Sequence, residues 1–203
     1  MSAGLRTIAI VDDDEAVRDS LSVLLDAHGF NIQVFVSGDA FLEAQASQSD
    51  CVLMDVRMPG RDGLTTLKDF RAGGRSVPVI VMSGHADVSM AVTALKSGAI
   101  DFVEKPFEAS ELLAAIGRAL TERTAYLDAQ NARLEAERNF ARLTPREKEI
   151  ATLLVAGEPN KGVARSLNIS VRTVETHRAN ILSKLDIRSL SDLVRLMMEV
   201  ASS

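Results

Sequence analysis

Polar side chains close four separate apolar segments in the first 105 residues, and together they have the chemistry of a phosphate site. Asp12 and Asp13 close the first segment, Asp55 the second, Ser83 the third and Lys105 the fourth. Each segment has the length and composition of a β-strand, and parallel α/β sheets bind ligands at the carboxyl ends of their strands. We therefore expect these groups to converge, which suits a Mg²⁺-assisted transfer of a phosphoryl group onto a carboxylate.

Each of these residues has an expected role in such a transfer. Asp55 is the best nucleophile, because it stands alone at the end of the central strand. Three carboxylates in one cleft repel each other, so a cation must be present for all of them to ionise. An all-oxygen site with room for water favours Mg²⁺ over zinc. Lys105 would pair with phosphate oxygens as a point charge, and Ser83 would donate a hydrogen bond to them.

Each motif alone also has an ordinary structural explanation. The acids at 12–14 can be helix N-terminal residues favoured by the dipole, Asp55 a solvated loop acid, and Ser83 part of a turn. Their joint occurrence at successive strand ends favours the phosphate site.

Strand and helix signals alternate through the first 107 residues, which predicts βαβ units and an α/β fold with a parallel sheet. Strands are expected at 7–11, 31–35, 51–54, 79–82 and 101–104. Helices are expected to begin near Asp14, Ser37, Leu64, Val88 and Ser110.

The segment from 110 to about 139 contains no proline and a single glycine, Gly117, so it predicts one long helix. Leucines recur in it every seven residues, at Leu113, Leu120, Leu127 and Leu134. Most companion positions are polar, which a strong coiled coil does not tolerate. The second half is therefore expected to be a charged, exposed linker or, at best, a weak self-association stripe.

Four further helices are expected after Leu143. Thr144, Pro145 and Glu147 form a capping box, Asn160 is expected to cap a short second helix, and Ser170 to cap a longer third one at 171–185. Ser189 and Asp192 are expected to cap the last. The second and third helices, joined by a tight turn at 168–170, indicate a helix-turn-helix.

The helix at 171–185 has a polar face that can read DNA. Its members follow i, i+3, i+4 and i+7 spacing and are expected to face base edges: Arg172, Glu175, Thr176 and Ala179. Arg178, Lys184 and Lys161 are expected to contact phosphates. His177 falls on the inward side, where packing or a backbone hydrogen bond is the expected role. From the pattern alone, a charged solvated helix remains the alternative.

Composition and charge narrow the class of protein. The net charge of −5 divides unevenly, with −7 over 1–125 and +2 over 143–203, so indiscriminate nucleic-acid binding is disfavoured while site-specific binding stays open. The single cysteine, Cys51, excludes an internal disulfide. No apolar run has the length of a membrane helix, and the polar N-terminus does not look like a signal peptide. We expect a cytoplasmic protein without membrane contact.

Residues 7–107 resemble the receiver domain of bacterial two-component response regulators. The motifs that carry the resemblance are IVDDD at 10–14, MDVRMPGRDG at 54–63, VMSGH at 81–85 and GAIDFVEKPF at 98–107. The resemblance implies a five-stranded, doubly wound, flavodoxin-like sheet with Asp55 as phospho-acceptor. It also implies that Asp12, Asp13, Asp55 and the backbone carbonyl of Arg57 hold Mg²⁺, and that Arg57 and His85 tune the lifetime of the phosphoryl group.

The same resemblance assigns Ser83 and Phe102 to a conformational switch and Lys105 to a phosphoryl contact. Two positions depart from the commonest pattern. Ser83 stands where threonine is frequent, and keeps the hydroxyl. Phe102 stands where tyrosine is common, so a signal must travel by ring packing.

The C-terminal segment resembles a LuxR-type helix-turn-helix, and the whole chain resembles FixJ-like regulators of the NarL family. The matching residues include LTPRE at 143–147, EPNK at 158–161 and HRAN at 177–180. We expect a receiver at 1–122, a helical linker at 123–142 and a DNA-binding domain at 143–203. The family implies dimerisation through the face at 88–106 and through the last helix.

The expected function is regulation of transcription. A sensor histidine kinase docks mainly on the first helix and phosphorylates Asp55, the phosphorylated homodimer binds DNA with paired half-sites, and RNA polymerase is a possible further partner. We expect that the protein is not an enzyme.

Two rival functions stay open. A phosphotransferase or phosphatase is disfavoured because Arg57 stands two residues after Asp55, where phosphatases of the haloacid-dehalogenase type need an acid. A relay whose C-terminal helices bind protein rather than DNA is the other.

Overall fold

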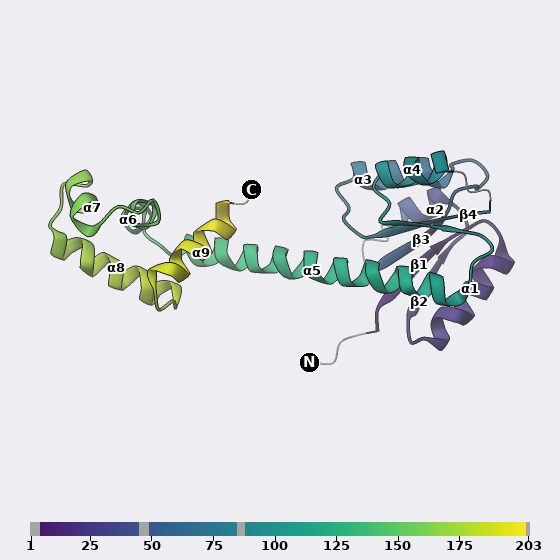
Figure 1. The fold of residues 1–203 in the computed structure, drawn as a ribbon, viewed down its shortest axis with the longest axis horizontal. Helices are drawn as coiled ribbons and strands as arrows, with labels where there is room; N and C mark the ends of the chain where they lie inside the picture. The colour runs from purple at the N-terminus through teal and green to yellow at the C-terminus, as the bar shows by residue number, and fades with distance from the viewer. Residues whose placement is uncertain (1–4, 45–48, 85–87, 202–203) are drawn as a thin grey trace. The chain divides into compact units, whose positions relative to one another are not determined.

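The computed structural model describes residues 5–44, 49–84 and 88–201. The chain forms two units, Met1–Tyr126 and Leu127–Ser203, and helix α5 (Ala109–Ala141) runs from the first into the second (Figure 1). His85, which we expect to tune phosphoryl lifetime, lies outside the described residues.

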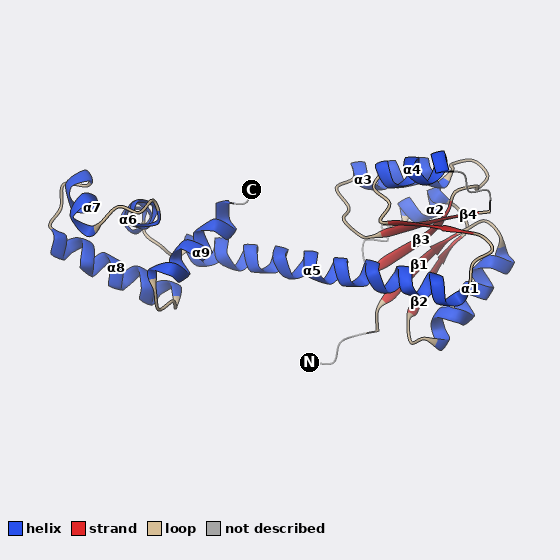
Figure 2. Cartoon of the chain, in the orientation of Figure 1, coloured by secondary structure: helices blue, strands red, loops and turns tan. Residues whose placement is uncertain are grey.

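The first unit is an α/β sandwich around a parallel sheet (Figure 2). The strands are β1 (Thr7–Val11), β2 (Asn31–Phe35), β3 (Cys51–Asp55), β4 (Val79–Ser83) and β5 (Asp101–Glu104), in the order β2-β1-β3-β4-β5. The other helices are α1 (Glu15–Ala27), α2 (Gly38–Glu43), α3 (Gly63–Ala72) and α4 (Val88–Lys96). The five-stranded doubly wound fold is therefore confirmed, and strands β3 and β4 are each one residue longer than predicted.

Alternating strand residues supply a core on each face of the sheet. On one face, strand residues such as Val52 and Val81 pack with Phe41 of α2 and Phe70 of α3. On the other face, residues such as Leu53 pack with side chains of α1 and α5. Central strands covered on both faces read as continuous apolar runs, which is the pattern that β3 and β4 have.

Short polar residues set the helix starts of this unit. The side chains of Asp14, Ser37 and Asp62 accept hydrogen bonds from backbone N–H groups at the beginning of α1, α2 and α3. Gly29 and Gly98 follow α1 and α4 with φ of +79° and +97°, a backbone region that L-residues rarely adopt.

The second unit is all α-helical. Its helices α6 (Pro145–Val155), α7 (Asn160–Ser166), α8 (Val171–Leu185) and α9 (Leu190–Ala201) enclose one apolar core. The capping box of Thr144 and Glu147 is present, and Ser170 caps α8. Phe140 of α5 packs against this core, so the end of the long helix is part of the second unit.

One predicted cap is wrong. The N-cap of α7 is Pro159 rather than Asn160, and Asn160 is the first helical residue. Proline holds φ near the value seen here, −69°, and its carbonyl accepts hydrogen bonds from the N–H groups of Gly162 and Val163. No side chain caps this helix.

Candidate functional site

The strand order brings the predicted phosphate residues to one edge of the sheet. Parallel pairing places Asp55 beside Met82 and Ser83 beside Glu104, while Asp12 follows the last residue of β1. The end residues of β1, β3, β4 and β5 are therefore neighbours, although they are spread over more than 90 positions of the chain.

Lys105 joins the two buried carboxylates of this edge. Its Nζ lies 2.6 Å from Oδ2 of Asp12 and 2.6 Å from Oδ1 of Asp55. Asp12 and Asp55 are only 1% and 7% exposed. Because all three groups are largely shielded from water, the two contacts are charge-assisted hydrogen bonds in a region of low dielectric.

The surroundings move the pKa values of both partners. Burial raises the pKa of Asp55, and the hydrogen bond and charge of Lys105 offset that rise only in part. Burial would lower the pKa of Lys105, but its contacts with Asp12 and Asp55 outweigh burial and raise it. The lysine therefore stays cationic between the two carboxylates.

Asp55 has its second oxygen held by the chain itself. Its Oδ2 accepts a hydrogen bond from the backbone N–H of Arg57 at 2.6 Å. Asp12 is held in a similar way, since its Oδ1 accepts from the backbone N–H of Asp14 at 2.9 Å. Both carboxylates are thus oriented before any ligand binds.

Asp13 differs from these two acids, because it is exposed and lies at the rim of the site. Among the residues that the structure describes, no three acids, histidines or cysteines stand close enough together to form a ready metal site. Two buried carboxylates with an exposed third beside them nevertheless provide hard oxygen donors with space for water, which is the set that Mg²⁺ uses.

Ser83 and Phe102 flank the site from β4 and β5. Ser83 is buried, and its carbonyl accepts a hydrogen bond from the backbone N–H of Lys105 at 2.8 Å. Phe102 is half-buried and packs against the core on the α3 side of the sheet. The main chain therefore connects Ser83 directly to the lysine that pairs with Asp12 and Asp55.

The loop from Val56 to Asp62 is closed tightly at its base. The N–H of Gly63 donates to the carbonyl of Val56 at 2.9 Å. A Cβ at Gly63 would lie 2.0 Å from the carbonyl oxygen of Asp55, so only glycine fits there. This base holds the Arg57 peptide next to the end of β3.

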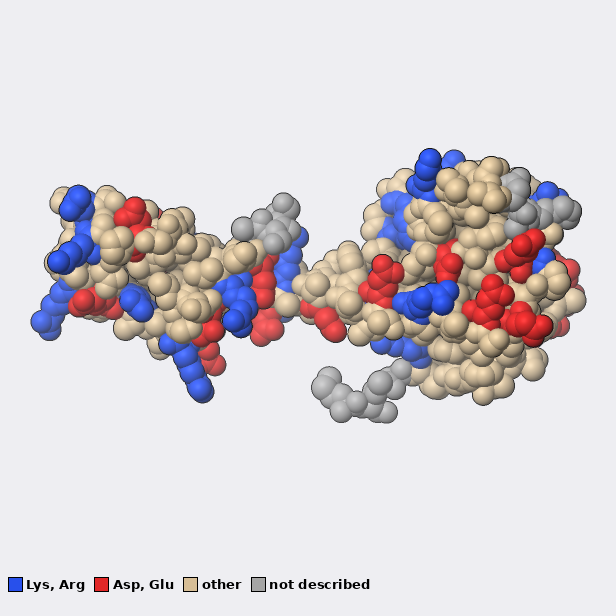
Figure 3. Space-filling view, viewed as in Figure 1, with Lys and Arg blue, Asp and Glu red and all other residues tan. Residues whose placement is uncertain are grey.

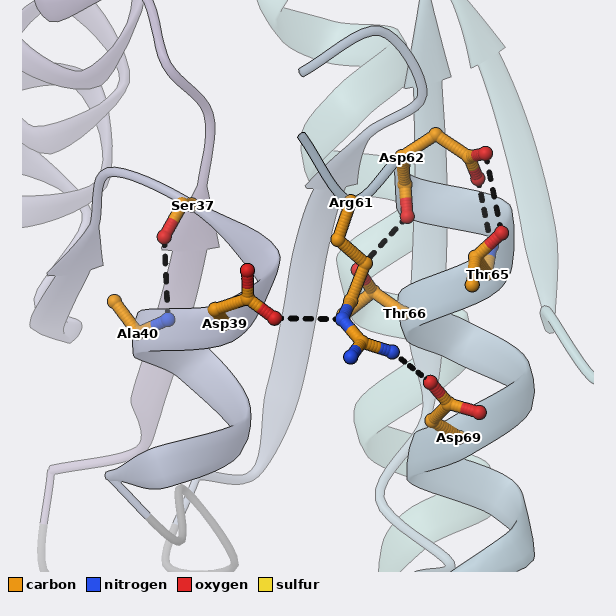
Figure 4. Close-up of polar contacts among 8 residues, drawn as sticks. All are labelled: Ser37, Asp39, Ala40, Arg61, Asp62, Thr65, Thr66 and Asp69. Atoms are coloured by element: carbon orange, nitrogen blue, oxygen red, sulfur yellow. Dashed lines mark hydrogen bonds and ion pairs between the residues drawn. The ribbon is translucent and has the colours of Figure 1, made fainter. Parts of the chain in front are cut away.

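Arg61 ties the outer end of that loop to two helices (Figure 4). Its Nε donates to Asp39 of α2 at 2.6 Å and its Nη1 to Asp69 of α3. Our sequence reasoning missed Arg61, and no local signal could have found it because its partners lie 22 and 8 positions away on different helices.

Two cavities adjoin the site. One of about 350 Å³ lies between α1 and the segment after β5, and is lined by Val17, Ser20 and Phe107 among others. Another of about 690 Å³ is lined by Asp13, Arg57 and the first turns of α3.

In the second unit, α8 separates a buried face from an exposed face. Val174, Ile181 and Leu185 are buried. The four predicted base-facing residues are all exposed: Arg172, Glu175, Thr176 and Ala179. Lys161 is also exposed and Arg178 is half-buried, and Lys and Arg side chains project from the surface of this unit (Figure 3).

Lys184, an expected phosphate contact, also has a partner within the domain, while its side chain stays 40% exposed. Its Nζ lies 2.7 Å from Oε2 of Glu147, a residue only 3% exposed. The hydrogen bond from Lys184 lowers the pKa of Glu147 to about 2, with Thr144 adding two further bonds. An ammonium that neutralises a buried carboxylate stabilises the fold of the domain.

His177 is half-buried, as its inward position predicts, but it makes no backbone bond from its buried Nδ1 within the described part of the chain.

Comparisons with known proteins identify a family for each of the two units. The family model of the response regulator receiver domain matches residues 8–117, and that of the luxR family of bacterial regulatory proteins matches 141–197. No described helix is long and apolar enough to cross a lipid bilayer.

The matches to whole proteins extend over both domains. FixJ of Bradyrhizobium diazoefficiens is 44% identical, with 94% of each chain covered. The tetrathionate response regulatory protein TtrR of Salmonella typhimurium is 40% identical over 98% of this chain and 95% of its own.

Solved structures agree with these matches. StyR has a TM-score of 0.85 at 36% identity, covering 97% of this chain and all of its own. Full-length FixJ from B. japonicum has a TM-score of 0.60 at 43% identity, with 98% of each chain covered. The resemblance recognised from the motifs is confirmed, and the chain belongs to the FixJ-type response regulators, transcriptional regulators that join a receiver domain to a LuxR-type DNA-binding domain.

Proposed function

We propose that a sensor histidine kinase phosphorylates Asp55, and that phosphorylation drives dimerisation and binding to DNA with paired half-sites. The observation that carries the proposal is Lys105, whose ammonium contacts both buried carboxylates at 2.6 Å. A pre-formed cation between two acids is suited to receive phosphoryl oxygens.

In the transfer, a carboxylate oxygen of Asp55 forms a bond to phosphorus as the bond from phosphorus to the kinase histidine nitrogen breaks, and that nitrogen leaves with its electron pair. Asp12, Asp13, Asp55 and the carbonyl of Arg57 would hold Mg²⁺. An ion bound there would supply positive charge against the phosphoryl oxygens. Lys105 exchanges a carboxylate oxygen for a phosphoryl oxygen and so remains paired.

The kinase would dock on α1 beside the acceptor. The cavity between α1 and Phe107 gives this surface a concave apolar element next to Lys105. The proposed contact therefore adjoins the group that receives the phosphate.

The signal would leave the site through β4 and β5. Ser83 approaches the new phosphoryl oxygens and Phe102 repacks inward, which alters the face at 88–106. Three apolar residues of α4 lie exposed on this face, namely Val88, Val92 and Leu95, at 82%, 43% and 50%. Burying them against a second copy would offset the loss of freedom on dimerisation.

A dimer would present two copies of α8 to DNA. Arg172, Glu175, Thr176 and Ala179 would face base edges in the major groove. Lys161, Arg178 and Lys184 would contact phosphates, and the exposed Met198 of α9 supports a second dimer contact. Two half-sites bound together lower the dissociation constant by raising the effective concentration of the second contact.

RNA polymerase is a further partner in this proposal, and kinase and DNA together imply action in the cytoplasm. The domain limits of 1–122, 123–142 and 143–203 also stay part of the proposal.

The test is solution mass by light scattering with Mg²⁺, with and without acetyl phosphate, using Asp55→Asn as the control. We expect the mass to double only in the phosphorylatable protein. If the mass stays constant while Asp55 carries phosphate, the dimer switch is wrong and release of a masked DNA-binding domain takes its place.

A further inference from the structure

A cavity of about 290 Å³ lies at the amino-terminal edge of the receiver sheet. Pro78 and Ile100, which precede β4 and β5, form one wall, and Glu122, Arg123 and Tyr126 of α5 form another. The phosphate residues stand at the other end of the same strands, roughly 16 Å away at 3.3 Å per residue. The cavity is thus separate from the acceptor site.

Two guanidinium groups line this cavity without a carboxylate partner among the described residues. Arg71 donates to the carbonyl oxygens of Arg75, Val77 and Gly98, which are neutral acceptors. Arg123 donates from Nη1 to the hydroxyl of Ser76 at 2.9 Å. Neither forms an ion pair, so two positive charges share one hollow.

Arg123 also has an unused donor. Its Nε is buried and has no hydrogen-bond partner within the described chain. Buried N–H groups are nearly always satisfied in folded proteins, and an exception points to a missing ligand or water. Burial also lowers the pKa of Arg71, and no carboxylate pairs with it among the described residues.

The remaining walls are mainly apolar. Pro78, Ala99, Ile100 and the Tyr126 side chain contribute hydrocarbon and ring surface. Specific small-molecule sites combine such walls with a few polar groups that fix orientation. At about 290 Å³, the space is at the small end of the usual range of ligand pockets.

We propose that this cavity binds a small organic monocarboxylate. Its carboxylate would pair with Arg123 and Arg71, and its apolar body would contact Pro78, Ile100 and Tyr126. Glu122 lines the same cavity and would repel a second negative charge, so a monoanion is favoured over a dianion.

The experiment is an isothermal titration of the full-length protein with benzoate as the probe. We expect saturable binding that becomes about tenfold weaker in Arg123→Gln, because a hydrogen-bonded charge pair is lost. Glu122→Gln should bind about twofold more tightly, since it removes the repelling charge. Arg118→Gln is the matched control, because Arg118 lies on the same helix, is 64% exposed in its side chain and pairs with Asp101.

Three results would overturn the proposal: no saturable binding, equal affinity in wild type and Arg123→Gln, or an equal loss in Arg118→Gln. Thermal unfolding of each variant shows whether it is folded. If Arg123→Gln does not fold, Glu122→Gln still tests the site. Benzoate binding should persist in Asp55→Asn. The proposal for the cavity and the proposal for phosphorylation are therefore tested independently. Inorganic phosphate that binds as tightly as benzoate would contradict the preference for a monoanion.

Discussion

The two units of this protein carry function in opposite ways. In the receiver, the candidate groups include buried charges from three strand ends, and Asp12 and Asp55 contact one lysine. In the C-terminal unit, the candidate groups are exposed side chains on one helix, above the buried Val174 and Ile181. Covalent chemistry requires a desolvated, oriented set of charges, whereas DNA recognition requires side chains that reach outward.

The difference predicts that single changes at the buried charges of the receiver have larger effects than single changes on α8. The largest effect is expected for Asp55→Asn, which removes the acceptor oxygen. Phosphorylation by labelled acetyl phosphate should fall to background, while folding is retained because a buried charge has been replaced by an amide of equal size. Incorporated label measures the effect, and circular dichroism verifies the fold. Remaining label on another residue would show that Asp55 is not the acceptor.

Lys105→Ala should be the next largest change. It leaves two buried carboxylates without their cation, and breaking such a group costs roughly 3–5 kcal/mol. Urea unfolding at neutral pH measures this loss, and added Mg²⁺ should restore part of it by supplying a replacement charge. A variant as stable as wild type would mean that Lys105 does not neutralise these acids.

In the C-terminal unit, Glu147→Gln should cost about 2 kcal/mol, because it breaks a buried hydrogen bond to a charged group. The folded-state pKa of Glu147 is about 2, below its unfolded value of 4.5. Its ionised form therefore stabilises the domain above pH 5, and that contribution disappears as the pH falls toward 2.

Unfolding followed between pH 6 and pH 2 tests this pairing. The variant should lack the part of the acid sensitivity that wild type shows below pH 5. The same acid sensitivity in both proteins would contradict the role given to Lys184 and Glu147.

Arg172→Ala on α8 should act on DNA binding and not on folding. A lost base-edge contact costs roughly 1–3 kcal/mol, or about 5- to 150-fold in affinity, and relaxes specificity at one base pair. Lys161→Ala is the matched comparison, since loss of a phosphate contact should weaken all sequences alike and reduce the salt dependence by about one ion. If Arg172→Ala lowered the affinity for specific and random DNA equally, Arg172 would be a phosphate contact rather than a base contact.

The smallest effect is expected for Arg61→Ala. Exposed ion pairs contribute little to stability, so thermal unfolding should not change measurably. Loss of the tie to Asp39 and Asp69 should instead loosen the loop that carries Arg57 and raise the Mg²⁺ concentration needed for phosphorylation. Arg118→Ala, which removes another exposed pair, serves as control and should leave that concentration unchanged.

Local patterns made much of the fold predictable. Apolar runs identified all five strands, and short polar residues identified the capped starts at Ser37, Thr144 and Ser170. These features depend on contacts within a few residues, so neighbouring positions contain the information. Asn160 was wrongly assigned as the N-cap, because proline is also well suited to that position. Backbone geometry decides which of the two residues is the N-cap.

The features that sequence reasoning missed all depend on distant partners. The pairing of Lys184, an expected phosphate contact, with Glu147 joins residues 37 positions apart. Phe140 lies in a segment expected to be linker, yet it packs on the core of the second unit. Arg61 and the cavity at Arg123 likewise join residues that no local window contains.

By itself, the sequence determined the family, the order of strands and helices, and the residue types available for phosphoryl transfer and DNA contact, because periodicity and motif spacing are properties of the chain. Tertiary structure alone decided which charges meet. Lys105 binds Asp12 and Asp55, Lys184 binds Glu147, and Arg71 and Arg123 share a cavity in which neither forms an ion pair among the described residues. The physical reason is that charge pairing depends on distance and burial, and the folded chain sets both through the order of the sheet and the packing of the helices.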